Sequence, residues 1–393
     1  MSSLRVALVS LHTSPLAVPG TGDAGGLNVY VVALAEALAD LGVEVELVTR
    51  RTAPAQPALE FTPGGVAVRF LEAGPPRELL KEDLPPIVGR FQSALSVLPR
   101  FDVLHSHYWL SGLAALPVAT MQHSAHIQSL HTVAAVKNVE RAPDDRPEPE
   151  ARLNAERLLV TRSAASITST EAEREAIVRD YRARPERVHV VTPGVDTALF
   201  HPAPAEGTGA PYLLTLGRIQ PLKGYDLAIR TLAAIEPARR PRLVIAGSAT
   251  PGSERFAEGL EMLAGDLGVA HLVDFVGAQT RDQAAELVRN AALLLLTSHS
   301  ETYGLVALEA AASGTPTLGT RASGMALSVR DGVSGVLLDG RSPEAWAAAV
   351  ERLLEHPAAL QRLRSSAAAY GSQHSWRRTA EATLTLYRRA AQL

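Results

Sequence analysis

The stretch Leu293-Leu-Leu-Leu-Thr-Ser-His-Ser-Glu-Thr-Tyr-Gly-Leu-Val-Ala-Leu-Glu-Ala-Ala-Ala-Ser-Gly-Thr-Pro316 predicts a strand, a polar turn and a helix in close succession. Residues 293–297 form a short apolar run, which is typical of a parallel strand covered on both faces. Ser300 and Thr302 are candidate N-caps for the helix, and Gly314 with Pro316 marks its end. Such a unit is typical of an α/β sheet, where ligands bind at the carboxyl ends of the strands.

Two carboxylates stand out within this stretch. Glu301 lies in the turn at the carboxyl end of the strand, and Glu309 is expected about two turns into the helix. This order places one acid at the mouth of a candidate site and the second beside it. A solvated turn acid and an ordinary helix acid would give the same pattern, so residues elsewhere in the chain must decide between the two interpretations.

Strands alternate with helices on both sides of this stretch, which predicts an α/β protein with doubly wound parallel sheets. A Pro- and Gly-rich segment at 202–211 is the candidate linker. We therefore expect two domains, an N-terminal one at 1–201 and a C-terminal one at 202–374, with a last helix at about 375–393 that packs back on the first domain. Strands are expected at 5–10, 43–49, 66–71, 101–106, 126–130, 166–169, 187–191, 212–216, 243–247 and 272–276.

Composition excludes several classes of protein. The 393 residues carry a net charge of -3, which gives no basic surface for nucleic acid. No stretch approaches the roughly 18 apolar residues of a membrane span, and no signal peptide is visible at the start. Cysteine is absent, which excludes disulfides, a thiolate nucleophile and cysteine metal ligands. We expect a cytoplasmic protein.

A Gly-rich segment, Pro19-Gly-Thr-Gly-Asp-Ala-Gly-Gly26, precedes a predicted helix at 28–41. Gly20 to Gly25 matches the G-x-G-x-x-G pattern of dinucleotide-binding proteins, so an NAD(P)-dependent oxidoreductase is one alternative. That pattern should follow its strand directly, and here Pro15 and Pro19 intervene. Free N–H groups at the start of the helix can still receive an anion.

Several polar side chains follow the predicted strands of the first half. His105, His107 and Tyr108 come at the end of one strand, and His131 with Thr132 at the end of another. No carboxylate or cysteine accompanies the three histidines at ligand spacing, so we expect no metal site.

Basic residues point to phosphate recognition. Arg218 and Lys223 share the first strand-to-helix loop of the second half, where two cations suit a diphosphate. Of the 38 basic residues only Lys81, Lys137 and Lys223 are lysines, which suggests positions that need a compact ammonium group. Together with Glu301 and Glu309, the two cations predict a nucleotide-sugar site. Fixed positive charge there would stabilise a departing diphosphate without a metal ion.

These residues carry a family resemblance. The order Gly-Arg218-x4-Lys223-Gly, then Glu301-x7-Glu309 before Gly-Thr-Pro, resembles the retaining family 4 glycosyltransferases of the glycogen-synthase and sucrose-synthase type, a GT-B fold with two Rossmann-like domains facing across a cleft. A closer resemblance, over nearly the whole chain, is to the branch of this family that acts in mycothiol biosynthesis. It is carried by His12-Thr-Ser-Pro15, Pro19-Gly-Thr-Gly-Asp-Ala-Gly-Gly-Leu-Asn-Val-Tyr30, His105-Ser-His-Tyr-Trp-Leu-Ser-Gly112, His131-Thr-Val-Ala-Ala-Val-Lys-Asn138 and Gly217-Arg-Ile-Gln-Pro-Leu-Lys223.

The resemblance implies transfer of N-acetylglucosamine from UDP-N-acetylglucosamine to 1D-myo-inositol 3-phosphate, with retention, no metal or other cofactor, and a homodimer. It implies catalytic roles for His131, Arg218, Lys223 and Glu301, and donor contacts from Gly26, Arg218, Lys223, Gln279, Glu301, Tyr303, Gly304, Leu305 and Glu309. Acceptor contacts are implied for Asn28, Lys81, Tyr108, Thr132 and Arg152.

The sequence departs from the family pattern at three places. Gln279 stands where an Arg is expected beside the base, Ser313 replaces a frequent Cys, and residues 322–328 replace a Gly-Gly-Leu-Pro run. These departures leave the donor base and the acceptor open. A related natural-product glycosyltransferase with another sugar nucleotide or acceptor is therefore a competing interpretation, and a non-catalytic sugar-binding module is a third.

Overall fold

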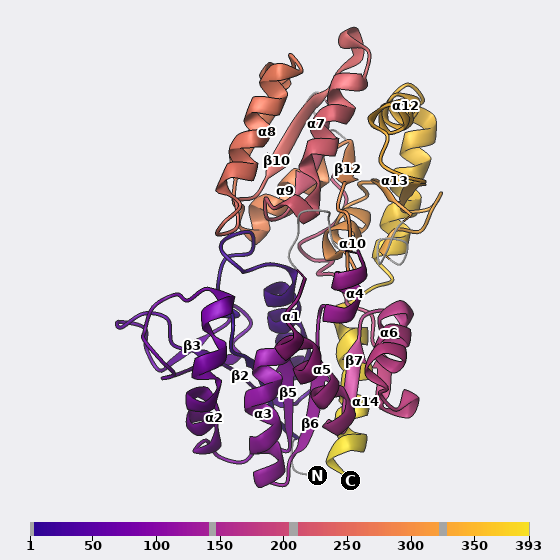
Figure 1. Ribbon diagram of the computed structural model, residues 1–393. Helices are drawn as coiled ribbons and strands as arrows, with labels where there is room; N and C mark the ends of the chain where they lie inside the picture. Colours follow the sequence, from indigo (N-terminus) through magenta and orange to yellow (C-terminus); the bar gives the residue numbers. More distant parts are fainter. Residues whose placement is uncertain (1–3, 141–146, 204–210, 322–327, 393) are drawn as a thin grey trace.

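The computed structural model describes residues 4–140, 147–203, 211–321 and 328–392. These residues form two α/β domains, one above the other in Figure 1, each built around its own sheet. The expected doubly wound architecture, with two Rossmann-like domains facing across a cleft, is confirmed. Most of the expected linker, residues 204–210, lies outside the described residues.

The first sheet has the strand order β3-β4-β2-β1-β5-β6-β7-β8. All neighbours are parallel except β3 and β4, and β3 itself was not expected from the sequence. A tight turn over 62–66 sends the chain straight back as a hairpin, which forces antiparallel pairing. The strands are β1 (Arg5–Ser10), β2 (Glu44–Arg50), β3 (Leu59–Phe61), β4 (Ala67–Leu71), β5 (Val103–His107), β6 (Ala125–Ser129), β7 (Ala165–Thr168) and β8 (Val188–Val190).

Helices cover both faces of this sheet. Apolar side chains such as Val31, Leu34 and Leu38 turn one face of the first helix onto the sheet core. The helices are α1 (Gly26–Asp40), α2 (Val88–Ser96), α3 (Trp109–Met121), α4 (Ala134–Glu140), α5 (Glu150–Arg162) and α6 (Glu171–Tyr181).

The second sheet has the order β11-β10-β9-β12-β13-β14, with every pair parallel. Its strands are β9 (Tyr212–Leu216), β10 (Arg242–Ala246), β11 (Val273–Gly277), β12 (Leu293–Leu296), β13 (Thr317–Thr320) and β14 (Gly335–Leu338). The last two strands were not expected from the sequence. The helices are α7 (Tyr225–Ala234), α8 (Glu254–Asp266), α9 (Arg281–Asn290), α10 (Leu305–Ala312), α12 (Pro343–Leu354) and α13 (Pro357–Gly371).

The final helix, α14 (Trp376–Ala391), leaves the second domain and lies along the first, where Figure 1 shows it in yellow near both termini. Its residues Trp376, Leu384 and Tyr387 belong to the same core cluster as α1. The Tyr387 hydroxyl lies 2.6 Å from His105 Nδ1, inside the first sheet. A segment from the end of the chain thus completes the core of the N-terminal half.

Each sheet has one point where the strand order reverses, between β1 and β5 in the first and between β9 and β12 in the second. Loops that leave adjacent strands at such a point run to opposite faces of the sheet and open a crevice, the usual ligand site of this architecture. The segments that follow these strands, and the one after β6, supply many of the polar side chains described next.

Candidate functional site

A cavity of about 480 Å³ lies between the two domains. The residues predicted for donor and acceptor line it from both sides, with one exception. They are Gly26, Lys81, Tyr108, His131, Thr132, Arg152, Arg218, Lys223, Gln279, Glu301, Tyr303, Gly304, Leu305 and Glu309.

Asn28 is the exception, because its buried side chain turns into the protein. Its amide nitrogen donates to Thr13 Oγ1 at 2.9 Å and to the Ser14 carbonyl at 2.6 Å, and its amide oxygen accepts from the Gly25 N–H at 2.9 Å. Asn28 therefore ties the first turn of α1 to the loop before it. A direct contact between Asn28 and the acceptor stays a prediction.

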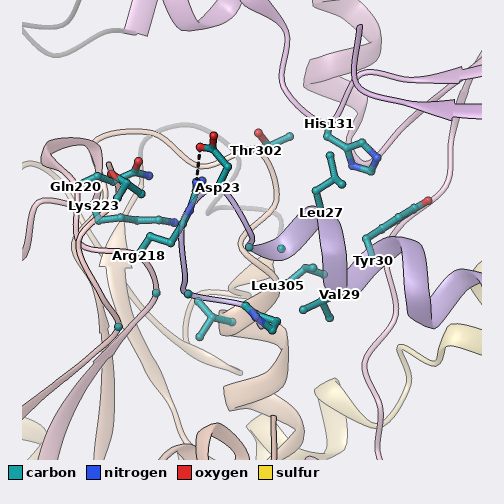
Figure 2. A pocket seen from close by; sticks show the side chains of 18 of the residues that line it. Asp23, Leu27, Val29, Tyr30, His131, Arg218, Gln220, Lys223, Thr302 and Leu305 are labelled. Atoms are coloured by element: carbon teal, nitrogen blue, oxygen red, sulfur yellow. Dashed lines mark hydrogen bonds and ion pairs between the residues drawn. The ribbon is translucent and has the colours of Figure 1, made fainter. Parts of the chain in front are cut away.

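The Gly-rich loop before α1 faces the second domain. Arg218 NH1 reaches across the cavity to Asp23 Oδ1 at 3.5 Å, the ion pair dashed in Figure 2. Gly25 lies against the same guanidinium, because a Cβ there would stand 3.4 Å from Arg218 Nε. Burial lowers the pKa of Arg218 from its ordinary value, and the charges of Asp23 and Glu301 act in the opposite direction.

Lys223 and Glu301 meet because their strands, β9 and β12, are neighbours. The His299 N–H donates to the Leu222 carbonyl at 2.8 Å, and the Thr297 side-chain hydroxyl donates to the Lys223 carbonyl at 2.9 Å, so two hydrogen bonds join the two loops. The Lys223 ammonium then forms an ion pair with Glu301. This places a cation and an acid side by side at the carboxyl edge of the second sheet.

The helix that carries the second acid starts later than expected. Gly304, with φ 80°, is the N-cap of α10, so Ser300 and Thr302 are not its caps. Glu309 is the fifth residue of α10, just over one turn into the helix rather than two. The sequence pattern was misleading because a left-handed glycine, without a side chain, ends the turn.

Glu309 holds a partner that sequence reasoning missed. Arg281 NH1, at the start of α9, donates to Glu309 Oε1 at 2.6 Å, and its guanidinium lies 4.7 Å from the centre of the Phe200 ring. Two residues earlier, Gln279 donates to the carbonyls of Val276 and Gly277, at 2.8 and 3.1 Å. The Gln279 amide therefore braces its own loop, while Arg281 supplies the cation of this corner.

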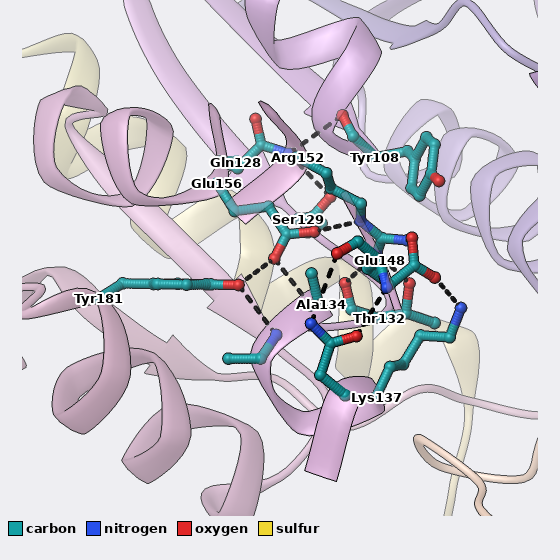
Figure 3. A network of polar contacts seen from close by, with 12 residues as sticks. Tyr108, Gln128, Ser129, Thr132, Ala134, Lys137, Glu148, Arg152, Glu156 and Tyr181 are labelled. Carbon is teal, nitrogen blue, oxygen red and sulfur yellow. Dashed lines mark hydrogen bonds and ion pairs between the residues drawn. The ribbon is translucent and has the colours of Figure 1, made fainter. Parts of the chain in front are cut away.

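On the first domain, Arg152 is the centre of the network in Figure 3. Its Nε donates to Glu156 at 2.6 Å, its NH2 to Thr132 Oγ1 at 2.8 Å, and its NH1 lies 2.9 Å from Glu148. The guanidinium also lies 4.9 Å from the centre of the Tyr108 ring. Burial favours a lower pKa for Arg152, but Glu156, Tyr108 and Glu148 raise it above its ordinary value, so this cation is permanent.

The histidines of the site are neutral. His107 Nδ1 and His131 Nε2 lie 2.8 Å apart, so one ring donates to the other. Burial lowers the pKa of His131 to about 3 and that of His107 well below its usual range. Tyr108 and His131 both have positive φ, 74° and 63°, a backbone region that costs energy for residues other than glycine and often marks functional sites. Over the described part of the chain, no three histidine or acidic side chains are placed to hold a metal ion.

Sequence reasoning also missed other lining residues, among them His12, Asp23 and Lys137. Lys137 had a signal, since it is one of three lysines, but its helix was not expected. Asp23 and His12 carried none beyond the motifs around them. Residues 322–327, where the sequence departs from the family pattern, lie outside the described residues.

Family models match both halves of the chain: the "Glycosyl transferase 4-like domain" over residues 25–194 and the "Glycosyl transferases group 1" model over residues 196–370. A D-inositol 3-phosphate glycosyltransferase from Thermobispora bispora is 41% identical, over 98% of this chain and 95% of its own length.

Two solved structures share the fold. Sucrose-phosphate synthase from Thermosynechococcus elongatus is 27% identical, with a TM-score of 0.89 over 98% of each chain. The Anabaena protein HepE, solved in complex with UDP and glucose, is 18% identical, with a TM-score of 0.78 over 97% of this chain and 98% of its own. None of the helices described here is long and apolar enough to cross a membrane.

Proposed function

The chain belongs to the glycosyltransferase family that its two family models and the Thermobispora bispora enzyme define, and we propose its reaction from this membership. We propose that it transfers N-acetylglucosamine from UDP-N-acetylglucosamine to 1D-myo-inositol 3-phosphate. This would be the first step of mycothiol biosynthesis. The observation that carries the proposal is one interdomain cavity with two sets of cations, Arg218 and Lys223 on the second domain and Lys81 and Arg152 on the first. One set suits the diphosphate of a donor and the other the phosphate of an acceptor.

In this scheme the bond between the anomeric carbon and the β-phosphate oxygen breaks, and UDP leaves with added negative charge. Arg218 and Lys223, with backbone at Gly26, bind that charge as it develops. The acceptor hydroxyl attacks from the same face, and its proton passes to the leaving phosphate oxygen. The configuration is retained, and no side-chain nucleophile is needed.

The remaining side chains position the two substrates. Glu309 accepts hydrogen bonds from the ribose hydroxyls and Glu301 from the donor sugar, since carboxylates only accept. His131 lines the reaction centre as a neutral imidazole. Lys81, Tyr108, Thr132 and Arg152 hold the acceptor phosphate, Asn28 supports the reaction centre, and Gln279, Tyr303, Gly304 and Leu305 complete the donor side.

The wider proposal covers the organisation of the enzyme. We place the domain boundary at residue 202, with the last helix assigned to the first domain, and expect a homodimer that needs no metal for the chemistry. A cytoplasmic location fits a chain without cysteine.

The test is UDP release from UDP-N-acetylglucosamine in the presence of inositol 3-phosphate, other inositol phosphates or free inositol. Release with inositol 3-phosphate supports the proposal, and release only with another acceptor assigns the chain to the competing natural-product interpretation. Measurable release with any acceptor rules out the non-catalytic module. A rise in melting temperature with NAD(P) but not with UDP would favour the oxidoreductase instead.

A further inference from the structure

All three lysines of the chain line the interdomain cavity. Every other basic residue is an arginine, so lysine was kept only here. Lys223 and Lys81 already have roles in the donor and acceptor sites, whereas Lys137 has none. We propose that Lys137 is a further ligand of the acceptor phosphate and makes the enzyme select a phosphorylated acceptor. The proposal rests on the proposed function for the identity of that acceptor.

The position of Lys137 follows from its helix. It lies on α4, which begins two residues after Thr132, and both residues line the cavity. Arg152 connects them, because it donates to Thr132 and shares Glu148 with Lys137. Its side chain is 36% exposed, so the ammonium can move toward an incoming group. A lysine ammonium is a compact charge with three donors on a flexible stem, which suits the oxygens of a phosphate.

Glu148 shows that one anion can span Lys137 and Arg152. One carboxylate oxygen, Oε1, pairs with the Lys137 ammonium, and the other, Oε2, lies 2.9 Å from Arg152 NH1 (Figure 3). A phosphoryl group offers two oxygens to two cations in a similar way. The two cations are therefore already spaced for a bridging anion at the wall of the cavity.

The contacts around Arg152 indicate which of its two acidic partners an incoming phosphate would displace. Glu156 is fully buried and accepts from Arg152, from the Tyr181 hydroxyl at 2.7 Å and from the Ala134 N–H at 2.9 Å. We therefore expect Glu156 to keep its pair with Arg152 when a phosphate binds. The Glu148 side chain is 17% exposed, and it pairs with the Lys137 ammonium and with one guanidinium nitrogen of Arg152. An acceptor phosphate can replace Glu148 on both cations without disturbing the pair of Arg152 and Glu156.

Replacement of Glu148 by a phosphate would let the enzyme distinguish a phosphorylated acceptor from a free polyol. A phosphorylated acceptor gains two charge-assisted contacts in place of one carboxylate, and it carries more charge than Glu148. A free polyol cannot displace the carboxylate and leaves Lys137 on Glu148. Lys137 thus acts as a specificity residue rather than as a catalytic one.

The test compares Lys137→Met, which removes the charge but keeps the length, with Lys137→Arg and the wild type. Arg157→Met, on the exposed side of α5, is the control for loss of one positive charge nearby. We measure kcat, the KM for inositol 3-phosphate at saturating donor, and the dissociation constants of inorganic phosphate and UDP. In Lys137→Met the KM and the phosphate constant should rise about ten- to a hundredfold, with UDP binding and kcat within about twofold of wild type. Arg157→Met should change neither constant more than about twofold, because salt screens exposed charges, and Lys137→Arg should fall between wild type and Lys137→Met.

An unchanged acceptor KM and an unchanged phosphate constant in Lys137→Met, with UDP binding intact, would overturn the proposal. Glu148→Gln provides a second arm, because loss of the competing charge should tighten phosphate binding, whereas weaker binding would mean that Glu148 only orients its neighbours. If the wild type does not use inositol 3-phosphate, the proposed function fails. The effect of Lys137→Met on inorganic phosphate binding then still decides whether Lys137 is an anion ligand.

Discussion

The charged residues of the proposed donor side are arranged as ion pairs. Arg218 faces Asp23, Lys223 faces Glu301 and Arg281 faces Glu309. Under the proposed function, a diphosphate or a ribose would therefore exchange partners with these side chains rather than meet bare charges. We expect such exchange to cost little reorganisation, because the proposed donor ligands are already held in place before a substrate binds.

This arrangement predicts different kinetic effects for two lysines. Lys223→Ala should lower kcat by roughly a hundredfold or more, since it removes the charge that we propose acts on the leaving phosphate. Lys81→Ala should mainly raise the KM for the acceptor. Steady-state rates with both substrates varied measure the difference, with Lys223→Arg as a charge-preserving control. The reverse pattern would mean that the donor and acceptor phosphate sites have been exchanged.

Glu309 allows a sharper test of a single side chain. If its carboxylate accepts from the ribose hydroxyls, Glu309→Gln should weaken UDP binding by roughly tenfold or more. The affinity difference between UDP and 2′,3′-dideoxy-UDP should then shrink, because the contact that distinguishes them is lost. Calorimetric dissociation constants of both nucleotides with both proteins complete the cycle. Equal weakening for the two nucleotides would instead mean that Glu309 acts through Arg281.

Some of these residues could be found from the sequence because strand ends predict where side chains gather. Arg218, Lys223 and Glu301 follow adjacent strands, and the structure brings them together. The inward turn of Asn28 could not be predicted, since it depends on the path of the loop from Thr13 to Gly25. The pair of Arg281 and Glu309 joins two helices, and no local pattern encodes that contact.

At the level of elements, the long periodic segments were predictable and the short ones were not. β9 has the expected bounds and α14 lies close to its expected position, because apolar runs and amphipathic spacing are strong local signals. The short strands β3 and β14 exist through pairing with neighbours and were not predicted. The helix α10 begins at a glycine whose positive φ fixes the turn, and propensity alone favoured an earlier start.

The docking of α14 gives a prediction for an element. A Cβ on Gly194 would lie 2.3 Å from the backbone nitrogen of Trp376, so no side chain fits between the last helix and the segment after β8. Gly194→Ala should lower the free energy of unfolding by roughly 1–3 kcal/mol. Gly259→Ala, within α8 and in open space, is the matched control and should raise it by roughly 0.5–1 kcal/mol. Urea unfolding measures both, and equal effects from the two variants would contradict the steric argument.

In the whole molecule, the points at which the strand order of the two sheets reverses face one cavity. The sequence predicts this arrangement only in part. Alternation of strands and helices predicts each sheet, but the order of strands depends on crossover connections. The placement of α14 joins residue 387 to the first domain through His105. The core of the first domain therefore depends on contacts between residues far apart in the chain.

The distribution of buried histidines predicts how the molecule responds to pH. His105, His107 and His126 lie within the first sheet, and burial lowers the pKa of His126 to about 3 and the others well below their usual range. The folded state therefore binds fewer protons than the unfolded state between about pH 6.5 and 3. Stability is present above pH 6.5 and lost as the pH falls, by about 1.4 kcal/mol per pH unit for each such histidine.

One buried acid has the opposite effect on stability, and it sets the upper limit of the pH range in which the protein is most stable. Burial raises the pKa of Glu173 from 4.5 to about 8, so its contribution falls as the pH rises from 4.5 to 8. The two trends together predict a maximum of stability near pH 6.5, with the steeper loss on the acid side because several histidines act against one carboxyl group. Urea unfolding from pH 4.5 to 8.5 measures the curve. His126→Gln should flatten the acid limb and the exposed His356→Gln should not, whereas a curve that keeps rising up to pH 8.5 would contradict the role given to Glu173.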